Sequence, residues 1–185
     1  MRITGGTFKG RKLNTVRNKA VRPTKAMVRE ALFSILGPGF CHNKRILDLF
    51  SGSGIMALES LSRGARQVIC VDSDVDSCSL IKTNFSLLGA DSSAQLLHMG
   101  VSQALSYLAS SGKIFDLIFL DPPYTDPEIG IKTMDDAFTA RLFAPDATAV
   151  LEHRAKIDLP PSKGMTMWKQ KKYGLTMLTF FRKEL

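Results

Sequence analysis

The sequence predicts an α/β protein built on a mostly parallel sheet, and three observations support this class. From residue 45 onward, short apolar runs rich in β-forming residues alternate with segments of helical periodicity. Glycine-containing turns such as Ser51-Gly52-Ser53-Gly54 separate these runs. The last twenty residues alternate on both sides of Gly174, which predicts a hairpin. We therefore expect parallel strands with an antiparallel edge.

The predicted elements follow in chain order. Residues 1–16 are punctuated by Gly5-Gly6 and Lys9-Gly10, which predicts a β-hairpin with strands near 2–5 and 11–15. Apolar residues at helical spacing predict a helix over 24–36. Strands are then expected at 46–50, 67–71, 94–98, 116–120, 147–152, 166–173 and 175–182, and helices at 55–62, 74–88, 101–110 and 127–143. We divide the chain into a basic extension, 1–23, and one domain, 24–185.

The composition favours a cytoplasmic globular protein. No apolar run approaches the roughly 20 residues that span a bilayer, and the first residues do not resemble a signal peptide. The cysteines, Cys41, Cys70 and Cys78, are odd in number and widely spaced. This pattern fits a reducing compartment and argues against a disulfide framework or a zinc site. We expect no metal and no membrane partner, and a monomer by default.

The net charge of +8 is unevenly distributed along the chain. Residues 1–30 carry +8, residues 31–153 carry −6 and residues 154–185 carry +6. Ordinary solvated lysines and arginines would also give a basic total, but such segregation favours a polyanionic partner, most simply nucleic acid. The residues expected to hold the phosphates of such a nucleic acid are Arg2, Lys9, Arg11, Lys12, Arg22 and Arg29.

A glycine turn follows the first strand of the predicted parallel sheet. The turn has Gly52 and Gly54 but lacks the third glycine of a dinucleotide fingerprint. Asp48 precedes it, and a carboxylate there suits a ligand with an amine or a cation better than a phosphate. A plain tight turn is the alternative. The candidate cofactor-binding residues of this stretch are Asp48, Phe50, Ser51, Gly52, Ser53 and Gly54.

Two more acidic signals follow the ends of other parallel strands. Asp72 and Ser73 come after the second strand, about 20 residues beyond the turn, where an acid accepts hydrogen bonds from ribose hydroxyls. Asp74 is expected to cap the next helix. Asp121-Pro122-Pro123-Tyr124 follows the fourth strand and predicts a stiff, acceptor-rich loop suited to a planar group with an NH2. Because the carboxyl ends of parallel strands share one edge, we expect all three signals to converge.

Together these motifs resemble the class I S-adenosylmethionine-dependent amino-methyltransferases, and most closely the RsmD-type 16S rRNA guanine-N2 methyltransferases. The core resemblance rests on Asp48–Gly54, Leu58–Gly64 and Asp121–Tyr124, which look like the family's motifs. Four stretches look like its N-terminal signature: Arg2–Gly6, Gly10–Leu13, Val21–Thr24 and Val28–Phe33. The resemblance covers nearly the whole chain and implies a Rossmann-like, seven-stranded class I fold.

The resemblance further implies S-adenosylmethionine as cofactor and 16S rRNA as substrate, at the guanine that the family calls guanine-966, in an assembled small-subunit particle. Asp121, Pro122, Pro123 and Tyr124 are then the catalytic residues, and Asp121 also lies beside the cofactor. Thr24 is expected either to line the methionine end of the cofactor or only to cap a helix. The family's polar residue beside the adenine is absent, so backbone groups of Gly100 and Val101 are expected there.

Other interpretations stay open at this point. The same loop serves adenine-N6 methyltransferases of DNA or RNA, and a non-catalytic RNA-binding assembly factor could keep the fold. A dehydrogenase is disfavoured by the missing third glycine. Two smaller expectations concern single stretches: Glu152-His153 is structural, and Trp168 lies in the core.

Overall fold

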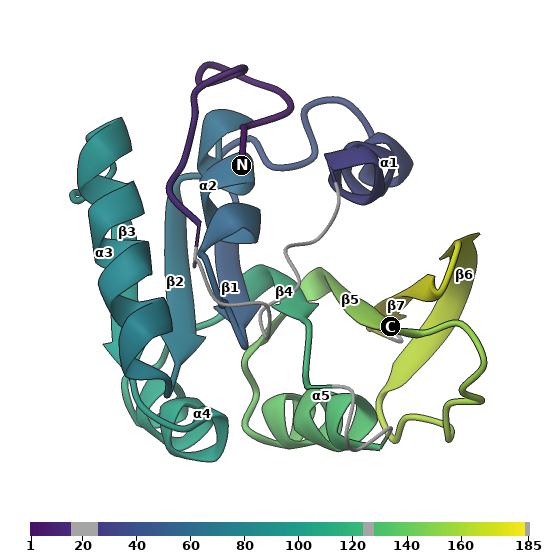
Figure 1. Ribbon diagram of the computed structural model, residues 1–185. Coiled ribbons are helices and arrows are strands. Elements are labelled where there is room, and N and C mark those ends of the chain that lie inside the picture. The colour runs from purple at the N-terminus through teal and green to yellow at the C-terminus, as the bar shows by residue number, and fades with distance from the viewer. Residues whose placement is uncertain (16–25, 124–127, 184–185) are drawn as a thin grey trace.

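The computed structural model describes residues 1–15, 26–123 and 128–183, and it shows a seven-stranded sheet in the order β3-β2-β1-β4-β5-β7-β6 (Figure 1). The strands are β1 (Arg45–Leu49), β2 (Gln67–Asp72), β3 (Ala94–His98), β4 (Phe115–Leu120), β5 (Phe143–Arg154), β6 (Met165–Tyr173) and β7 (Thr176–Lys183). The helices are α1 (Ala26–Leu36), α2 (Ile55–Ser62), α3 (Val75–Leu88), α4 (Val101–Ser110) and α5 (Ile129–Thr139). No helix in these ranges is long and apolar enough to cross a membrane.

The strand pairing confirms the predicted class. β1 to β5 pair in parallel, and β7 pairs antiparallel with both β5 and β6. The sequence prediction was least accurate around α5 and β5. The helix ends at Thr139, close to Arg141 with its positive φ of 56°, and β5 begins at Phe143 rather than 147. The β4–β5 register shifts across this early part of β5, which contains Pro145, a residue that cannot donate to a ladder.

Two apolar clusters form the core, one on each face of the sheet. α1, α2 and α3 cover one face with residues such as Phe33, Ile55 and Ile81. α4 and α5 cover the other face with residues such as Leu105 and Met134 (Figure 1). β1, β2 and β4 are therefore buried on both sides, which explains their nearly continuous apolar sequences.

The N-terminal segment packs on the C-terminal end of α2, and its self-pairing is shorter than predicted. The segment pairs antiparallel around a bridge between Arg2 and Lys12: Leu13 N–H donates to the Met1 carbonyl at 2.8 Å, and Ile3 N–H donates to the Arg11 carbonyl at 3.1 Å. The intervening backbone bonds to Ser62 instead: Thr7 N–H donates to its carbonyl at 2.7 Å and Phe8 N–H to its hydroxyl at 2.9 Å. Ile3 and Leu13, flanking this stretch, are buried in the core beneath α1.

A buried carboxylate, Glu59 of α2, joins the N-terminal segment and α1 to the sheet domain. Its Oε1 accepts from Thr4 N–H at 2.7 Å and from Arg29 Nε at 3.3 Å, while its Oε2 accepts from Thr4 Oγ1 at 3.0 Å. Arg63 Nη2 lies 3.5 Å from the same Oε2. Arg29 is buried with Glu59, so the expectation that Arg29 holds RNA phosphate is wrong; its guanidinium is used inside the fold.

Trp168 also departs from its prediction as a core residue. Its side chain is 39% exposed. The β6–β7 register shifts between Met167 and Lys169, which leaves Trp168 outside the regular ladder on an edge strand. Its ring contacts Phe180 in a tilted arrangement, with 5.5 Å between the ring centroids and 57° between the ring planes.

We predict that Glu59→Leu lowers the free energy of unfolding by about 3–5 kcal/mol, because it leaves the Arg29 guanidinium buried without its counter-charge. Urea unfolding followed by circular dichroism measures this loss. Glu30→Leu, at an exposed position on α1, is the matched control. A loss below about 1 kcal/mol for Glu59→Leu would show that the ion pair is not essential to the fold.

Candidate active site

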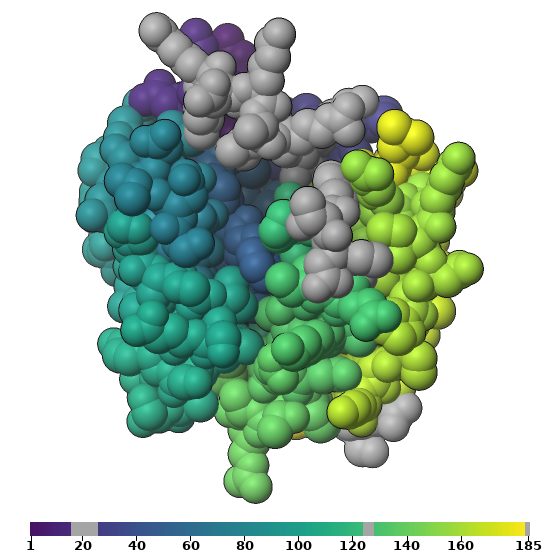
Figure 2. Space-filling view, turned by 60° about the horizontal axis from the view of Figure 1, so that its bottom comes forward, coloured from purple at the N-terminus to yellow at the C-terminus, as the bar shows by residue number. Residues whose placement is uncertain are grey.

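The carboxyl ends of β1, β2 and β4 bring the three predicted acidic signals to one edge of the sheet. β1 lies between β2 and β4, and Leu49 pairs with both Val71 and Leu120. The backbone N–H of Asp121 donates to the carbonyl of Leu49 at 3.5 Å, which ties the loop after β4 to the end of β1. In Figure 2 the blue residues after β1 lie at the middle of this face, between teal segments on one side and green and yellow segments on the other.

The turn after β1 has the tight backbone that its glycines predicted. Gly52 and Gly54 have positive φ angles of 54° and 72°. Phe50 has a φ of 60°, a conformation that costs energy for a bulky residue and is typical of functional loops. A Cβ on Gly54 would lie 3.2 Å from Ile81 Cγ1, so a larger residue would require Ile81 of α3 to shift and would also be strained by the positive φ.

Two serines of this turn make hydrogen bonds that hold it to neighbouring elements. Ser51 Oγ donates to the carbonyl of Asp48 at 2.6 Å and accepts from Val71 N–H at 3.0 Å, joining β1 to β2. The carbonyl of Ser53 accepts from Asn84 of α3 at 3.1 Å. Both serine side chains are buried, so they shape the turn from inside.

Asp48 is a buried carboxyl group beneath the start of α2. Its Oδ2 accepts from Ala57 N–H at 3.3 Å. Burial raises the pKa of Asp48 to about 7, the Ala57 hydrogen bond opposes this rise, and the charge of Asp72 adds to it. The groups that set the pKa of Asp48 include no positive charge that would stabilise its ionised form.

Asp72 connects the turn to the end of β2. Its Oδ2 accepts from Gly52 N–H at 2.7 Å and its Oδ1 from Asp74 N–H at 2.9 Å. A carboxylate can accept more than these two bonds, so Asp72 keeps capacity for a ligand hydroxyl. Ser73 is exposed beside it, and Asp74 caps α3 as expected, accepting from Ser77 N–H at 2.8 Å.

Asp121 ends β4 in an acidic environment. Burial raises the pKa of Asp121 well above its usual range, with the charges of Glu152 and Asp48 adding to the rise. Pro122 behind it is buried and Pro123 is exposed. The sequence analysis did not predict the electrostatic effect of Glu152 on Asp121. The position of Glu152, near the carboxyl end of the parallel strand that neighbours β4, was the signal that could have revealed it.

His153, beside Glu152, has the structural role expected of it. Its Nε2 lies 2.8 Å from Thr179 Oγ1 in β7, and its Nδ1 lies 3.0 Å from the carbonyl of Arg154. Burial lowers its pKa.

The remaining predicted residues fall into three groups. Gly100 caps α4 after β3 in an extended conformation and Val101 begins that helix, which places both beyond the strand that neighbours β2. Arg22, Thr24 and Tyr124 lie outside the described residues. Four basic residues of the N-terminal segment are exposed: Arg2, Lys9, Arg11 and Lys12.

The described residues contain no group of three or more histidine, cysteine or acidic side chains placed to hold a metal ion. The three cysteines are free and buried.

A sheet with one antiparallel hairpin edge, a glycine turn after β1 and acidic groups at the carboxyl ends of β1, β2 and β4 define a class I methyltransferase fold. The family model described as Conserved hypothetical protein 95 matches residues 1–182, so the chain belongs to this family, that of the RsmD-type methyltransferases.

Its relatives agree with that assignment. The chain is 35% identical to the putative rRNA methyltransferase YlbH of Bacillus subtilis, over 99% of both chains. It is 36% identical to ribosomal RNA small subunit methyltransferase D of Escherichia coli, over 67% of this chain and 60% of that protein. The solved structure of the putative methyltransferase yhhF from Escherichia coli superposes with a TM-score of 0.85, at 29% identity, covering 100% of this chain and 98% of that one.

We predict that Asp48→Asn changes how stability depends on pH. The raised pKa means that the folded state holds a proton that the unfolded state has lost, so wild-type stability falls as pH rises from the unfolded pKa of 3.8 to the folded value of about 7. Wild type should therefore lose about 2 kcal/mol relative to Asp48→Asn between about pH 5.5 and about pH 7.5.

Urea unfolding at both pH values measures the difference, and Asp146→Asn, at an exposed position, is the control. A wild-type and variant difference that stays constant with pH would contradict the assignment of a raised pKa to Asp48.

Proposed function

We propose that the protein transfers a methyl group from S-adenosylmethionine to the exocyclic N2 amine of a guanine in 16S rRNA. The nucleotide would be the one that the family calls guanine-966, and the substrate an assembled small ribosomal subunit. The observation that carries the proposal is the convergence of Asp48, Asp72 and Asp121 at the ends of adjacent strands, with the Asp121-Pro122 loop tied to β1.

The residues around β1 and β2 fit the proposed cofactor. Asp48 carries a carboxyl group whose ionisation is opposed by burial and by Asp72, and a cationic amine nearby would relieve both effects. Asp72 can accept hydrogen bonds from ribose hydroxyls. The adjacent turn contains two glycines, so a ligand can approach its backbone closely. When bound, S-adenosylmethionine supplies an electrophilic methyl group on a positively charged sulfur.

Asp121 and Pro122 are the groups proposed to hold the target amine. The guanine amine is a weak nucleophile because its lone pair is shared with the ring. The carboxylate of Asp121 and the carbonyl of Pro122 would accept its two N–H bonds and turn the lone pair toward the methyl group. As the nitrogen gains the methyl carbon it becomes cationic, and its proton passes to Asp121 or to water. Tyr124 is proposed to stack on the flipped base, worth about 1–3 kcal/mol.

The exposed basic residues of the N-terminal segment support an RNA substrate. Arg2, Lys9, Arg11 and Lys12 lie on a segment that is fixed to α2 and buried at Ile3 and Leu13, so their positions relative to the sheet are defined. They would hold phosphates of the rRNA. The choice of guanine over adenine is supported by the N-terminal family signature, and the small-subunit substrate by the name of the Escherichia coli relative. We take the active form to be a cytoplasmic monomer.

The direct test is transfer of a radiolabelled methyl group to small subunits that lack this modification, followed by digestion to nucleosides. The proposal expects the label in N2-methylguanosine, with naked 16S rRNA compared as substrate. Label in N6-methyladenosine would replace the proposal with the adenine-methylating alternative. Binding of small subunits with no transfer at all would favour a non-catalytic assembly factor.

We predict that Asp121→Ala lowers turnover about 10²–10⁴-fold while the affinity for S-adenosylmethionine changes little. Because the pKa of Asp121 is raised and its ionised form is the proposed acceptor, wild-type turnover should rise with pH through that pKa. Asp121→Asn should be less active than wild type, and its turnover should not show this rise with pH.

Single-turnover methyl transfer across pH measures turnover, and calorimetry measures cofactor affinity. Asp146→Asn is the control at an exposed carboxylate. Equal losses of turnover and cofactor affinity in Asp121→Ala would remove Asp121 from the amine-binding role.

A further inference from the structure

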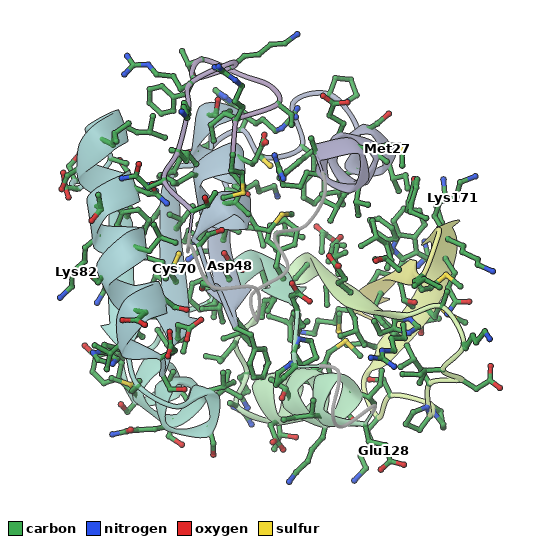
Figure 3. All side chains as sticks on the ribbon, viewed as in Figure 1. Met27, Asp48, Cys70, Lys82, Glu128 and Lys171 are labelled. Carbon is green, nitrogen blue, oxygen red and sulfur yellow. The ribbon has the colours of Figure 1, made fainter. Side chains whose placement is uncertain are left out.

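The edge strand β6 carries a basic and aromatic surface that the proposed function does not yet use. We define the β6 surface as Trp168, Lys169 and Lys171, all of them exposed. β6 has one neighbour, β7, and lies at the end of the sheet opposite β3. Figure 3 shows Lys171 at this end of the molecule and Lys82 of α3 at the other.

The exposed indole of this surface needs an explanation beyond solubility. Lysines on an edge strand discourage pairing with another chain, and they would suffice for that purpose. Trp168, 39% exposed, does not serve it. Trp168 is held from below by Phe180 and has the Lys169 ammonium 6.0 Å from its ring. A fixed, partly exposed indole beside lysines is a platform for a base beside a phosphate.

The register of the sheet relates this surface to Asp121. Asp121 comes one residue after the last pair of the β4–β5 register, and Glu152 holds the matching place in β5. Glu152 pairs with Leu178 of β7, and Leu178 pairs with Lys171 of β6. Asp121 and Lys171 therefore share one row, three strand spacings apart, which is about 14 Å. This is about four nucleotides at roughly 3.4 Å per stacked nucleotide.

The two residues also share one face of the sheet. Neighbours in a row point to the same side, and Leu178 belongs to the core cluster beneath α1, α2 and α3. Lys169, two residues before Lys171, points to that side as well, and so does Trp168, since it contacts Phe180 of the same cluster. The sheet thus places acidic groups toward β1 and β2 and a basic aromatic surface toward β6, with Asp121 between them.

We propose that the β6 surface binds the rRNA strand that flanks the target nucleotide, with Lys169 and Lys171 on phosphates and Trp168 stacked on a base. This inference rests on the proposed function for the identity of the RNA. The positive charge favours RNA, which carries one phosphate per nucleotide, and the indole accepts any base, so the surface adds affinity without selecting a sequence.

Equilibrium binding to 16S rRNA transcribed in vitro, measured over a range of salt concentrations, tests the proposal. The Lys169→Ala/Lys171→Ala variant should reduce the slope of log affinity against log salt by about 1.4, at about 0.7 per phosphate contact with single strands. Trp168→Ala should weaken binding about tenfold at every salt concentration without changing the slope. Lys82→Ala, on the far side of the molecule, should match wild type.

Methyl transfer to small subunits gives a second measurement. The lysine variant should raise KM for the subunit and leave kcat and cofactor affinity unchanged, because it removes binding that is equal in ground and transition states. Thermal melting and gel filtration check that each variant is folded and monomeric.

Several outcomes would overturn the inference. A slope equal to that of wild type, or aggregation of the lysine variant with unchanged RNA affinity, would show that these lysines only protect the sheet edge. Weaker binding to assembled subunits but not to naked rRNA would assign the surface to a ribosomal protein. If wild type binds rRNA but transfers no methyl group, the proposed function fails, and the slopes still decide whether the β6 surface binds RNA.

Discussion

The site depends on the burial of a carboxyl group, Asp48, at the junction of β1 and α2. Burial raises its pKa to about 7, and the charge of Asp72 adds to the rise. Asp48 in turn helps to raise the pKa of Asp121. Asp48 is thus destabilised in its charged form by Asp72 and itself disfavours the charged form of Asp121, and a cationic ligand nearby would relieve both effects. The acidic edge therefore favours a positively charged methyl donor over the phosphate-rich dinucleotides that other doubly wound sheets bind.

The strand order separates acidic groups from exposed lysines along this edge of the sheet. β1 and β2 lie on one side of β4 and present the acidic groups, whereas β5, β7 and β6 lie on the other and lead to exposed lysines. Asp121 is placed at the boundary, where a donor from one side could meet a base from the other. The N-terminal segment adds basic residues and is held to the domain by the buried Glu59, which joins it to α1 and α2. One sheet thus carries both of the proposed binding regions.

Much of this arrangement could be predicted from the sequence, because strong periodicity and glycine turns identify the elements. α2 and β3 have the predicted bounds, and the convergence of Asp48, Asp72 and Asp121 follows from the common edge of parallel strands. The burial of charged residues inside the fold was harder to predict. Arg29 and Glu59 have the composition of surface residues, and only their pairing shows that they are buried. Trp168 is exposed because of a register shift that the local sequence pattern does not predict.

The most direct test of the central claim is a crystal structure of the protein with S-adenosylhomocysteine. We expect the ribose hydroxyls within about 2.6–3.2 Å of the Asp72 carboxylate, hydrogen-bond distance. The amino group of the ligand should lie on the Asp48 side of the glycine turn, and the sulfur should face Asp121. A ligand bound elsewhere on the sheet edge, or one whose sulfur faces away from Asp121, would contradict the account.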